Sequence, residues 1–286
     1  MIAALAFAAT AIAGPDSSLL VSTEWLARHL SDRSIVVVQV DISDSAYRSG
    51  HLPGARFLPY QMIITEASGL STELPAVDSL RDRLEHVGIS TGSHVVLTGS
   101  PLTVARAFFT LDYLGLRNVS VLDGGVTKWR AEGRPIDRTI PVVRRGALAV
   151  SAHPEVVASS EWIAAHLASG ARGVALVDTR HEDEYLGTNP ASAGHIAGAR
   201  RLEWEAMFSS TTEFSLKEYG ELARMWDALA APGDTVVAYC RVGHRSSATY
   251  LVARLLGYPA KLYDGSYQDW SARRLPLVTT PTSGRP

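Results

Sequence analysis

The sequence predicts two copies of one α/β domain, each a mostly parallel sheet covered by helices. The first observation is length, because 286 residues exceed one ordinary core of about 100–150 residues. The second is that short apolar strands alternate with amphipathic helical stretches, which is typical of a parallel sheet with helices on both faces. The third is that the same series of segments occurs twice, in the same order, over about 110 residues.

Each copy opens in the same way. A helix-start segment comes first, then a β-branched strand that ends in aspartate, then a Gly-His-x-x-Gly-Ala-Arg turn. In order, the paired segments are 22–27 and 159–164, 35–41 and 174–178, and 50–56 and 194–200. The run 174–177 is apolar throughout, as expected of a strand buried on both faces. The shared order predicts one ancestral unit in tandem.

Each copy also closes in the same way, with a third strand, a helical stretch, a short strand, an Asp-Gly pair and a tryptophan. The third strands are 94–98 and 235–239, and the closing residues are Asp123, Gly124 and Trp129 in one copy and Asp264, Gly265 and Trp270 in the other. Apolar residues at helical spacing precede the third strands: Leu80, Leu84 and Val87, then Leu222, Trp226 and Leu229. These patterns predict a helix before each third strand.

Proline interrupts the periodicity between the copies, which indicates a linker. The interrupting residues are Pro135, Pro141 and Pro154. We therefore expect an N-terminal segment at 1–16, a first domain at 17–137, a linker at 138–154 and a second domain at 155–286.

Composition excludes several classes of function. Lys and Arg number 27 against 29 Asp and Glu, a net charge of −2, which is far from the basic surface of a nucleic-acid binder. The single cysteine, Cys240, rules out an internal disulfide, a CxxC redox pair and multi-cysteine metal clusters. The histidines are scattered, and His181-Glu182 lacks the second histidine of a zinc-protease helix. We expect no metal, no cofactor, and neither nucleic acid nor membrane as a partner.

The N-terminus carries an apolar run at 2–13, shorter than the ~20 residues that cross a bilayer. It ends in Ala11-Ile12-Ala13, which fits the small-x-small pattern of signal-peptidase cleavage, although no Lys or Arg precedes it. The run predicts a signal peptide and a periplasmic or secreted protein. The alternative is a cytoplasmic protein with an apolar extension.

Residues that both copies share are predicted to be architectural, because a catalytic group need not be present twice. His51 and His195 occupy the same place in the two Gly-His-x-x-Gly turns. The tryptophan pairs are interpreted in the same way, as packing residues: Trp25 with Trp162, and Trp129 with Trp270.

The copies differ where the third strand ends. In the second copy, strand 236–239 runs into Cys-Arg-Val-Gly-His-Arg at 240–245, followed by an apolar helix. The matching segment of the first copy, 99–104, places Gly99 opposite Cys240 and has no positive charge. The first copy is therefore expected to be chemically silent.

A thiol at the carboxyl end of a parallel strand lies where open α/β sheets bind ligands. A loop over a helix N-terminus turns backbone N–H groups inward and forms an anion cradle. Arg241 and Arg245 add positive charge, so Cys240 is expected to be a reactive thiolate at neutral pH. Gly243 fits a positive φ or a close backbone approach. The alternative, a buried inert cysteine, is disfavoured by two neighbouring arginines.

With its tandem units, paired Gly-His turns and Cys-Arg-x-Gly-x-Arg loop, residues 17–278 resemble a two-domain rhodanese of the thiosulfate sulfurtransferase family. The resemblance implies a tandem of rhodanese-like domains, each with a five-stranded, mostly parallel sheet flanked by helices. It also implies that a silent N-terminal domain packs on a catalytic C-terminal one. In that family the cysteine takes a sulfane sulfur to become a persulfide and passes it to a nucleophilic acceptor.

The resemblance assigns roles within the loop. Cys240 matches the persulfide-forming cysteine, and Arg241 and Arg245 match the basic positions. Val242, Gly243 and His244 complete the substrate-binding loop. His244 departs from the family pattern, and two alternatives are open: a solvent-facing place on the loop rim, or a part in acceptor choice.

Two residues outside the loop are also expected to contact substrate. Arg180 matches a family arginine that contacts the anionic substrate, and its counterpart in the silent copy is Ser43. Trp204 falls where the family has an aromatic residue at the pocket wall.

These residues predict a thiosulfate sulfurtransferase (EC 2.8.1.1) that moves sulfur through Cys240 to cyanide or a thiol. Two loop arginines suit the compact thiosulfate dianion. The alternatives are a 3-mercaptopyruvate sulfurtransferase, whose loop is typically less basic, and a non-enzymatic sulfur carrier. A cysteine phosphatase would need Cys-x5-Arg, but position 246 is serine and the arginine comes one residue earlier, at Arg245. A six-residue loop encloses less space, suited to a single outer sulfur.

Overall fold

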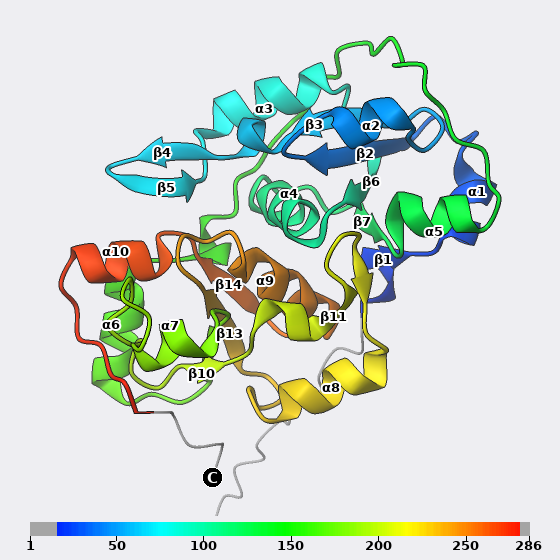
Figure 1. Ribbon diagram of the computed structural model, residues 1–286. Helices are drawn as coiled ribbons and strands as arrows, with labels where there is room; N and C mark the ends of the chain where they lie inside the picture. Colours follow the sequence, from blue (N-terminus) through cyan, green and yellow to red (C-terminus); the bar gives the residue numbers. More distant parts are fainter. Residues whose placement is uncertain (1–15, 281–286) are drawn as a thin grey trace, which may run out of the picture.

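The computed structural model describes residues 16–280 and shows two α/β domains stacked on each other (Figure 1). The expected signal segment and its cleavage after Ala13 lie outside the described residues. None of the helices in the described part of the chain has the length and apolarity that a bilayer crossing requires.

The first domain is built on a five-stranded parallel sheet in the order β1-β7-β6-β2-β3. Its strands are β1 (Leu20–Val21), β2 (Ile35–Asp41), β3 (Arg56–Pro59), β6 (His94–Gly99) and β7 (Val119–Leu122). Its helices are η1 (Ser17–Leu19), α1 (Thr23–His29), α2 (Ser45–Ser49), η2 (Tyr60–Ile63), α3 (Val77–His86), α4 (Pro101–Tyr113) and α5 (Gly125–Ala131). A separate antiparallel hairpin is formed by β4 (Thr65–Ala67) and β5 (Leu70–Glu73).

The second domain repeats this plan, with a parallel sheet in the order β10-β9-β13-β14-β8. Its strands are β8 (Val157–Ala158), β9 (Val174–Asp178), β10 (Arg200–Arg201), β13 (Thr235–Tyr239) and β14 (Ala260–Tyr263). Its helices are η3 (Pro154–Val156), α6 (Ser160–Ser169), α7 (Glu182–Leu186), η4 (Trp204–Met207), α8 (Tyr219–Asp227), α9 (Ser246–Leu255) and α10 (Ser266–Ala272). The second hairpin is β11 (Phe208–Ser210) with β12 (Ser215–Leu216). Corresponding strands occupy corresponding places, so the predicted tandem α/β fold is confirmed.

The repeated sequence segments make the same local contacts in both domains. Ser22 and Ser159 cap α1 and α6, each accepting a hydrogen bond of 3.1 Å from the backbone N–H of the tryptophan three residues on. His51 is fully buried, stacked on Tyr47 with ring centroids 3.9 Å apart. His195 stacks on Tyr185 in the same way at 3.5 Å. Both histidines therefore serve the architecture of the turn.

The paired tryptophans behave less uniformly. Trp129 and Trp270 are buried, and each donates its indole N–H to the carbonyl of a following proline, at 2.7 and 2.9 Å. Trp162 instead lies largely at the surface, 38% exposed, stacked on His166. Trp162 therefore packs at the surface of the second domain and not in its core, because the helix α6 turns this position outward.

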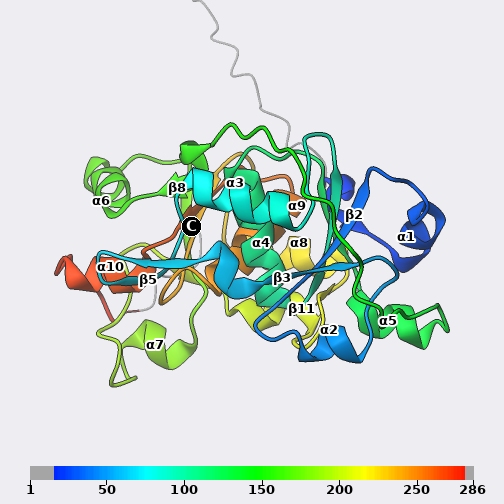
Figure 2. The same ribbon diagram turned by 90° about the horizontal axis from the view of Figure 1, so that it is seen from above.

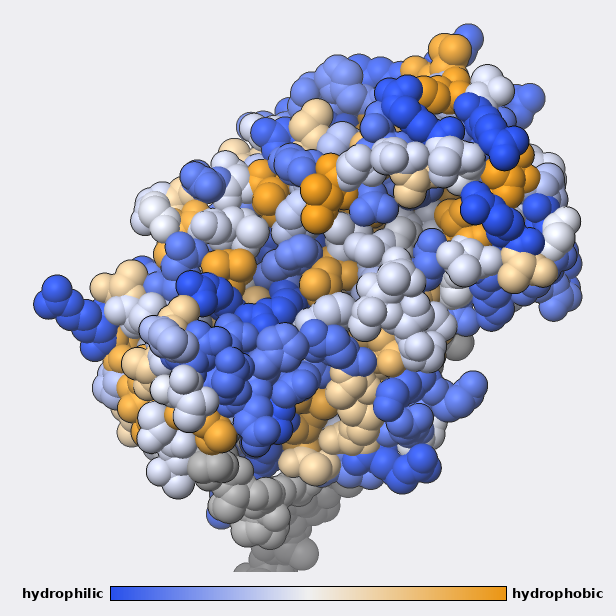
Figure 3. All heavy atoms as spheres, in the orientation of Figure 1, coloured by the Kyte–Doolittle hydropathy of each residue, from blue (hydrophilic) through white to orange (hydrophobic). Residues whose placement is uncertain are grey.

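The two domains share one apolar core. Helices α4 and α9 pack against each other at its centre, as Figure 2 shows. Phe109 of α4 meets Tyr250 of α9 edge to face, with ring centroids 5.1 Å apart. Asp112 of α4 is bound by the Tyr250 hydroxyl and by Arg254, a buried network that spans the interface. On the outer face in Figure 3, apolar side chains form small patches among hydrophilic ones.

Each domain also extends its hairpin over the other. The β4–β5 hairpin projects from the first domain above α10 (Figure 1), where the Ser71 backbone N–H donates to Gln268 at 3.0 Å. The β11–β12 hairpin reaches the first domain, where Phe214 exchanges backbone hydrogen bonds with Gly99 (3.2 Å) and Gly124 (2.8 Å). The hairpins thus form a reciprocal pair, each lying over the sheet end of the opposite domain.

Candidate active site

The six-residue loop 240–245 joins β13 to α9 at the carboxyl end of the second sheet. Cys240 begins the loop, and its side chain is fully buried. Its backbone N–H donates to the Ser266 hydroxyl at 3.1 Å, and its carbonyl accepts from the Tyr267 N–H at 3.0 Å. The first turn of α10 therefore fixes the position from which the thiol projects.

Gly243 lies at the tightest point of the loop. Its φ is +82°, and a Cβ placed there would come within 2.5 Å of the Asp264 carbonyl oxygen. Both conditions favour glycine, because a side chain strains this backbone conformation and also clashes with backbone that cannot easily move. The loop packs directly on the turn between β14 and α10.

The hairpin of the first domain holds the middle of the loop. Thr72, with φ of +61°, donates its hydroxyl to the Val242 carbonyl. Because a peptide unit is planar, a carbonyl that points at the hairpin turns the N–H of Gly243 away from it. Val242 is thus bound to the hairpin through its backbone carbonyl, and the first domain sets the orientation of the peptide between Val242 and Gly243.

Arg106 of α4 supports this contact from beneath. It is fully buried, pairs with Asp264, and donates to the Thr72 carbonyl at 2.5 Å. Asp264 also accepts from the Leu74 N–H at 2.9 Å. Thr72, Arg106 and Asp264 carry no sequence signal that marks them as site residues, since all three act across the domain interface.

The two loop arginines have different environments. Arg245 forms a bidentate pair with Glu184, with N–O distances of 2.6 and 2.8 Å. Burial favours its neutral form, but the hydrogen bonds to Glu184 and the interaction with Cys240 outweigh burial and raise the pKa of the guanidinium. Arg241 is exposed and has no ion-pair partner among residues 16–280. Arg241 is therefore the loop charge that is free to meet an anion.

Arg180 lies inside the second domain. It is fully buried and donates to Asp178 at 2.6 to 3.1 Å. Its remaining hydrogen bonds go to Ser192 Oγ at 3.0 Å and to the Gly194 carbonyl at 2.9 Å. The Arg180 Cζ also lies 4.5 Å from the centroid of the Tyr267 ring. The guanidinium faces protein groups in this arrangement, because the carboxylate that ends β9 is itself buried and needs a counter-charge. A contact with the sulfur donor stays a prediction.

His244 is half-buried and does not lie on an open loop rim. Its ring packs on Tyr60 of the first domain with centroids 4.7 Å apart, and its Nε2 is buried. Burial, with Arg106 and Arg245 nearby, lowers the pKa of His244 to about 4. The imidazole is therefore neutral at physiological pH. The helix η2, distant in sequence, covers what would otherwise be the loop rim.

Trp204 begins η4, which packs against α9 next to the loop. Its ring is half-buried and meets Phe208 edge to face, with centroids 5.9 Å apart. This places the residue beside the helix that follows the loop, and contact with substrate at a pocket wall stays a prediction.

The matching segment of the first domain has no cradle. Strand β6 ends at Gly99 and α4 begins at Pro101, so the loop is missing. Gly99 has φ of +136°, and a Cβ there would lie 2.3 Å from the Val40 carbonyl oxygen. A side chain therefore has no room at this position.

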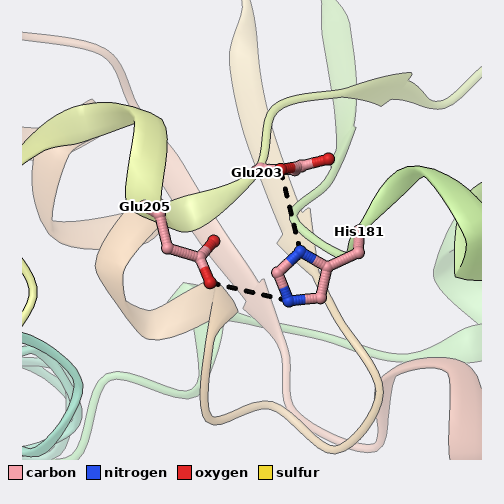
Figure 4. A group of neighbouring side chains, drawn as sticks. All are labelled: His181, Glu203 and Glu205. Atoms are coloured by element: carbon pink, nitrogen blue, oxygen red, sulfur yellow. Dashed lines mark ion pairs between the residues drawn. The ribbon is translucent and has the colours of Figure 1, made fainter.

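One group of side chains has the composition of a metal site. His181 lies between Glu203 and Glu205 (Figure 4), with N–O distances of 3.7 and 3.5 Å. Glu203 also pairs with Arg201, and the imidazole is 49% exposed. Sequence spacing did not bring these residues together. The contacts of His181 with Glu203 and Glu205 are ion pairs only when the imidazole is protonated.

Comparison with known proteins identifies the family. The model of the rhodanese-like domain matches residues 22–132 and again 159–273. The sulfur carrier protein TtuD of Thermus thermophilus is 32% identical over 88% of this chain and 93% of its own length. Thiosulfate sulfurtransferase of Azotobacter vinelandii is 34% identical over 82% of this chain and 88% of its own. The chain therefore belongs to the rhodanese-like domain family.

Solved structures agree on the fold. The crystal structure of SseA from Escherichia coli, a 3-mercaptopyruvate sulfotransferase, superimposes with a TM-score of 0.74 at 22% identity, covering 87% of this chain and 98% of that one. With two such domains and thiosulfate sulfurtransferases among its relatives, the protein is a sulfurtransferase of the rhodanese family.

Proposed function

We propose that the protein is a thiosulfate sulfurtransferase with Cys240 as its nucleophile. The thiolate attacks the sulfane sulfur of thiosulfate, the S–S bond breaks, and sulfite leaves with the bonding electron pair. Cyanide or a thiolate then attacks the outer sulfur of the persulfide, and the Cys240 thiolate is released. Each half-reaction balances without a redox partner.

The observation that carries this proposal is the composition of the loop. The six-residue loop leads into the N-terminus of α9, and it keeps one arginine, Arg241, without an ion-pair partner in the described chain. A compact dianion gains charge-assisted hydrogen bonds in such a place. The Azotobacter relative, named for thiosulfate, supports the same donor.

A direct test is mass spectrometry of the purified protein after incubation with thiosulfate. We expect a mass increase of about 32 Da for one added sulfur, reversed by cyanide with release of thiocyanate, and ping-pong kinetics. Cys240→Ser should abolish both the adduct and turnover. Ser100→Ala, in the matching segment of the first domain, is the control and should leave both unchanged. A serine variant that forms thiocyanate at the wild-type rate would end the proposal.

Two alternatives give different results in the same experiment. Faster turnover with 3-mercaptopyruvate than with thiosulfate would favour the keto-acid donor. A second candidate function, a sulfur carrier, is favoured by the Thermus relative of that name. A carrier would form the persulfide but show little catalytic turnover with small acceptors.

A further inference from the structure

Three buried polar atoms around the Cys240 loop have no hydrogen-bond partner among the described residues. They are the Tyr60 hydroxyl, Nε2 of His244 and the Ser246 hydroxyl. An unpartnered buried polar group has lost its hydrogen bonds to water without replacing them, so such groups are uncommon unless a ligand or water satisfies them. Two of the three belong to the second domain, and Tyr60 comes from the first.

Tyr60 is held in place by its surroundings rather than by its hydroxyl. The side chain is 6% exposed and begins η2, and its ring is tilted 30° against that of His244. The phenol interacts electrostatically with both Cys240 and Arg106. Through its packing on His244, the phenol therefore lies at the domain interface against the Cys240 loop.

The charge of the neighbouring groups indicates what the hydroxyl meets. Burial, opposed by Arg106 and assisted by Cys240 and Asp264, raises the pKa of Tyr60 to about 12. The phenol thus stays protonated at neutral pH and acts as a donor. His244 is neutral beside it, while Arg245 and Arg241 supply positive charge to the same loop. Such a set of donors suits the oxygens of a small anion.

We propose that Tyr60 is a substrate-binding residue supplied by the first domain, whose hydroxyl donates a hydrogen bond to the anionic group of the sulfur donor at Cys240. This rests on the proposed function only for the identity of the donor. In the transfer from thiosulfate, the S–S bond breaks and the electron pair leaves with sulfite. A phenol donor facing the sulfonate oxygens stabilises the charge that sulfite gains.

The test compares two alkylating probes of Cys240 in Tyr60→Phe, which keeps the ring on His244 and removes only the donor. Iodoacetate carries a carboxylate, and iodoacetamide is its neutral equivalent. We expect alkylation by iodoacetate to slow about tenfold, the loss typical of one hydrogen bond to a charged group. Alkylation by iodoacetamide should change by less than about twofold. Tyr113→Phe, at the end of α4, is the matched control and should change neither rate.

The same variants are then assayed with thiosulfate, where Tyr60→Phe should raise KM about tenfold. Equal rates of iodoacetate alkylation in Tyr60→Phe and wild type would overturn the inference, as would equal slowing by both probes. The proposed function fails by a separate result, a wild-type protein that takes no sulfur from thiosulfate. The probe comparison still decides the role of Tyr60 in that case.

Discussion

Removing the buried charge pair between the domains should destabilise the protein and disturb its active loop together. Arg106 has no exposed surface and the Asp264 side chain is 5% exposed, so Arg106→Met leaves a carboxylate buried without its counter-charge. Breaking such a pair costs ~3–5 kcal/mol. The Leu74 N–H still binds Asp264, which places the expected loss near ~3 kcal/mol.

The assay is a double-mutant cycle by urea unfolding, followed by tryptophan fluorescence. Asp264→Asn should cost a similar amount, and the double variant should cost ~2–3 kcal/mol less than the sum, because it leaves no unpaired charge. Arg145→Met is the control, since that arginine forms exposed pairs, which contribute little to stability. Additive single effects, or single losses below ~1 kcal/mol, would refute the reasoning.

Activity measured on the same variants links the pair to the loop. Arg106 bonds the Thr72 carbonyl, and Thr72 holds the Val242 carbonyl. We therefore expect Arg106→Met to lower kcat/KM at least about tenfold at a urea concentration where the protein stays folded. Wild-type kcat/KM in a folded Arg106→Met protein would show that the hairpin contact does not orient the loop.

Three further predictions follow from single positions. Gly243→Ala should lower kcat/KM at least about tenfold through strain and the Asp264 clash, whereas Gly233→Ala, with nearly the same φ of +83° and open space, should not; equal effects would contradict the clash. Burial raises the pKa of Glu73 to about 7, so the stability that this group contributes is full below about pH 4.5 and is lost as pH rises through 7. Allowing for partial exposure, Glu73→Gln should raise the free energy of unfolding in urea by ~1–2 kcal/mol at pH 8 and by little at pH 4.5. Equal gains at both pH values would exclude this titration. Arg180→Met should lower the free energy of unfolding, measured in urea, by ~3–5 kcal/mol. An unchanged urea midpoint with a raised KM for thiosulfate would instead show direct donor binding.

The fold and the reactive loop could be predicted from sequence because their signals are local. The duplicated order of strands and turns predicts the tandem architecture, and six consecutive residues carry the thiol, the glycine and both arginines. Gly243 illustrates the limit of this: the need for glycine is visible, but the Asp264 carbonyl that enforces it lies in another segment.

The remaining parts of the site depend on contacts between distant segments. His244 packs on Tyr60, and Glu184 balances the charge of Arg245. No rule of sequence spacing connects either pair of residues. The family resemblance predicts that Arg180 contacts the substrate, and its counterpart in the silent copy is Ser43. Asp178, two residues earlier, instead binds it inside the domain, and sequence alone does not show which of two anions an arginine meets.

The reciprocal hairpins have a consequence for how this chain can be divided. Its repeat has a clear sequence boundary, which invites the production of residues 155–286 as a minimal enzyme. Such a fragment would carry the nucleophile but lose Thr72 and Arg106, and its own hairpin would have nothing to cover. The second domain repeats the first in sequence, but its active loop depends on residues of the first domain. Engineering of this protein therefore has to keep both domains together.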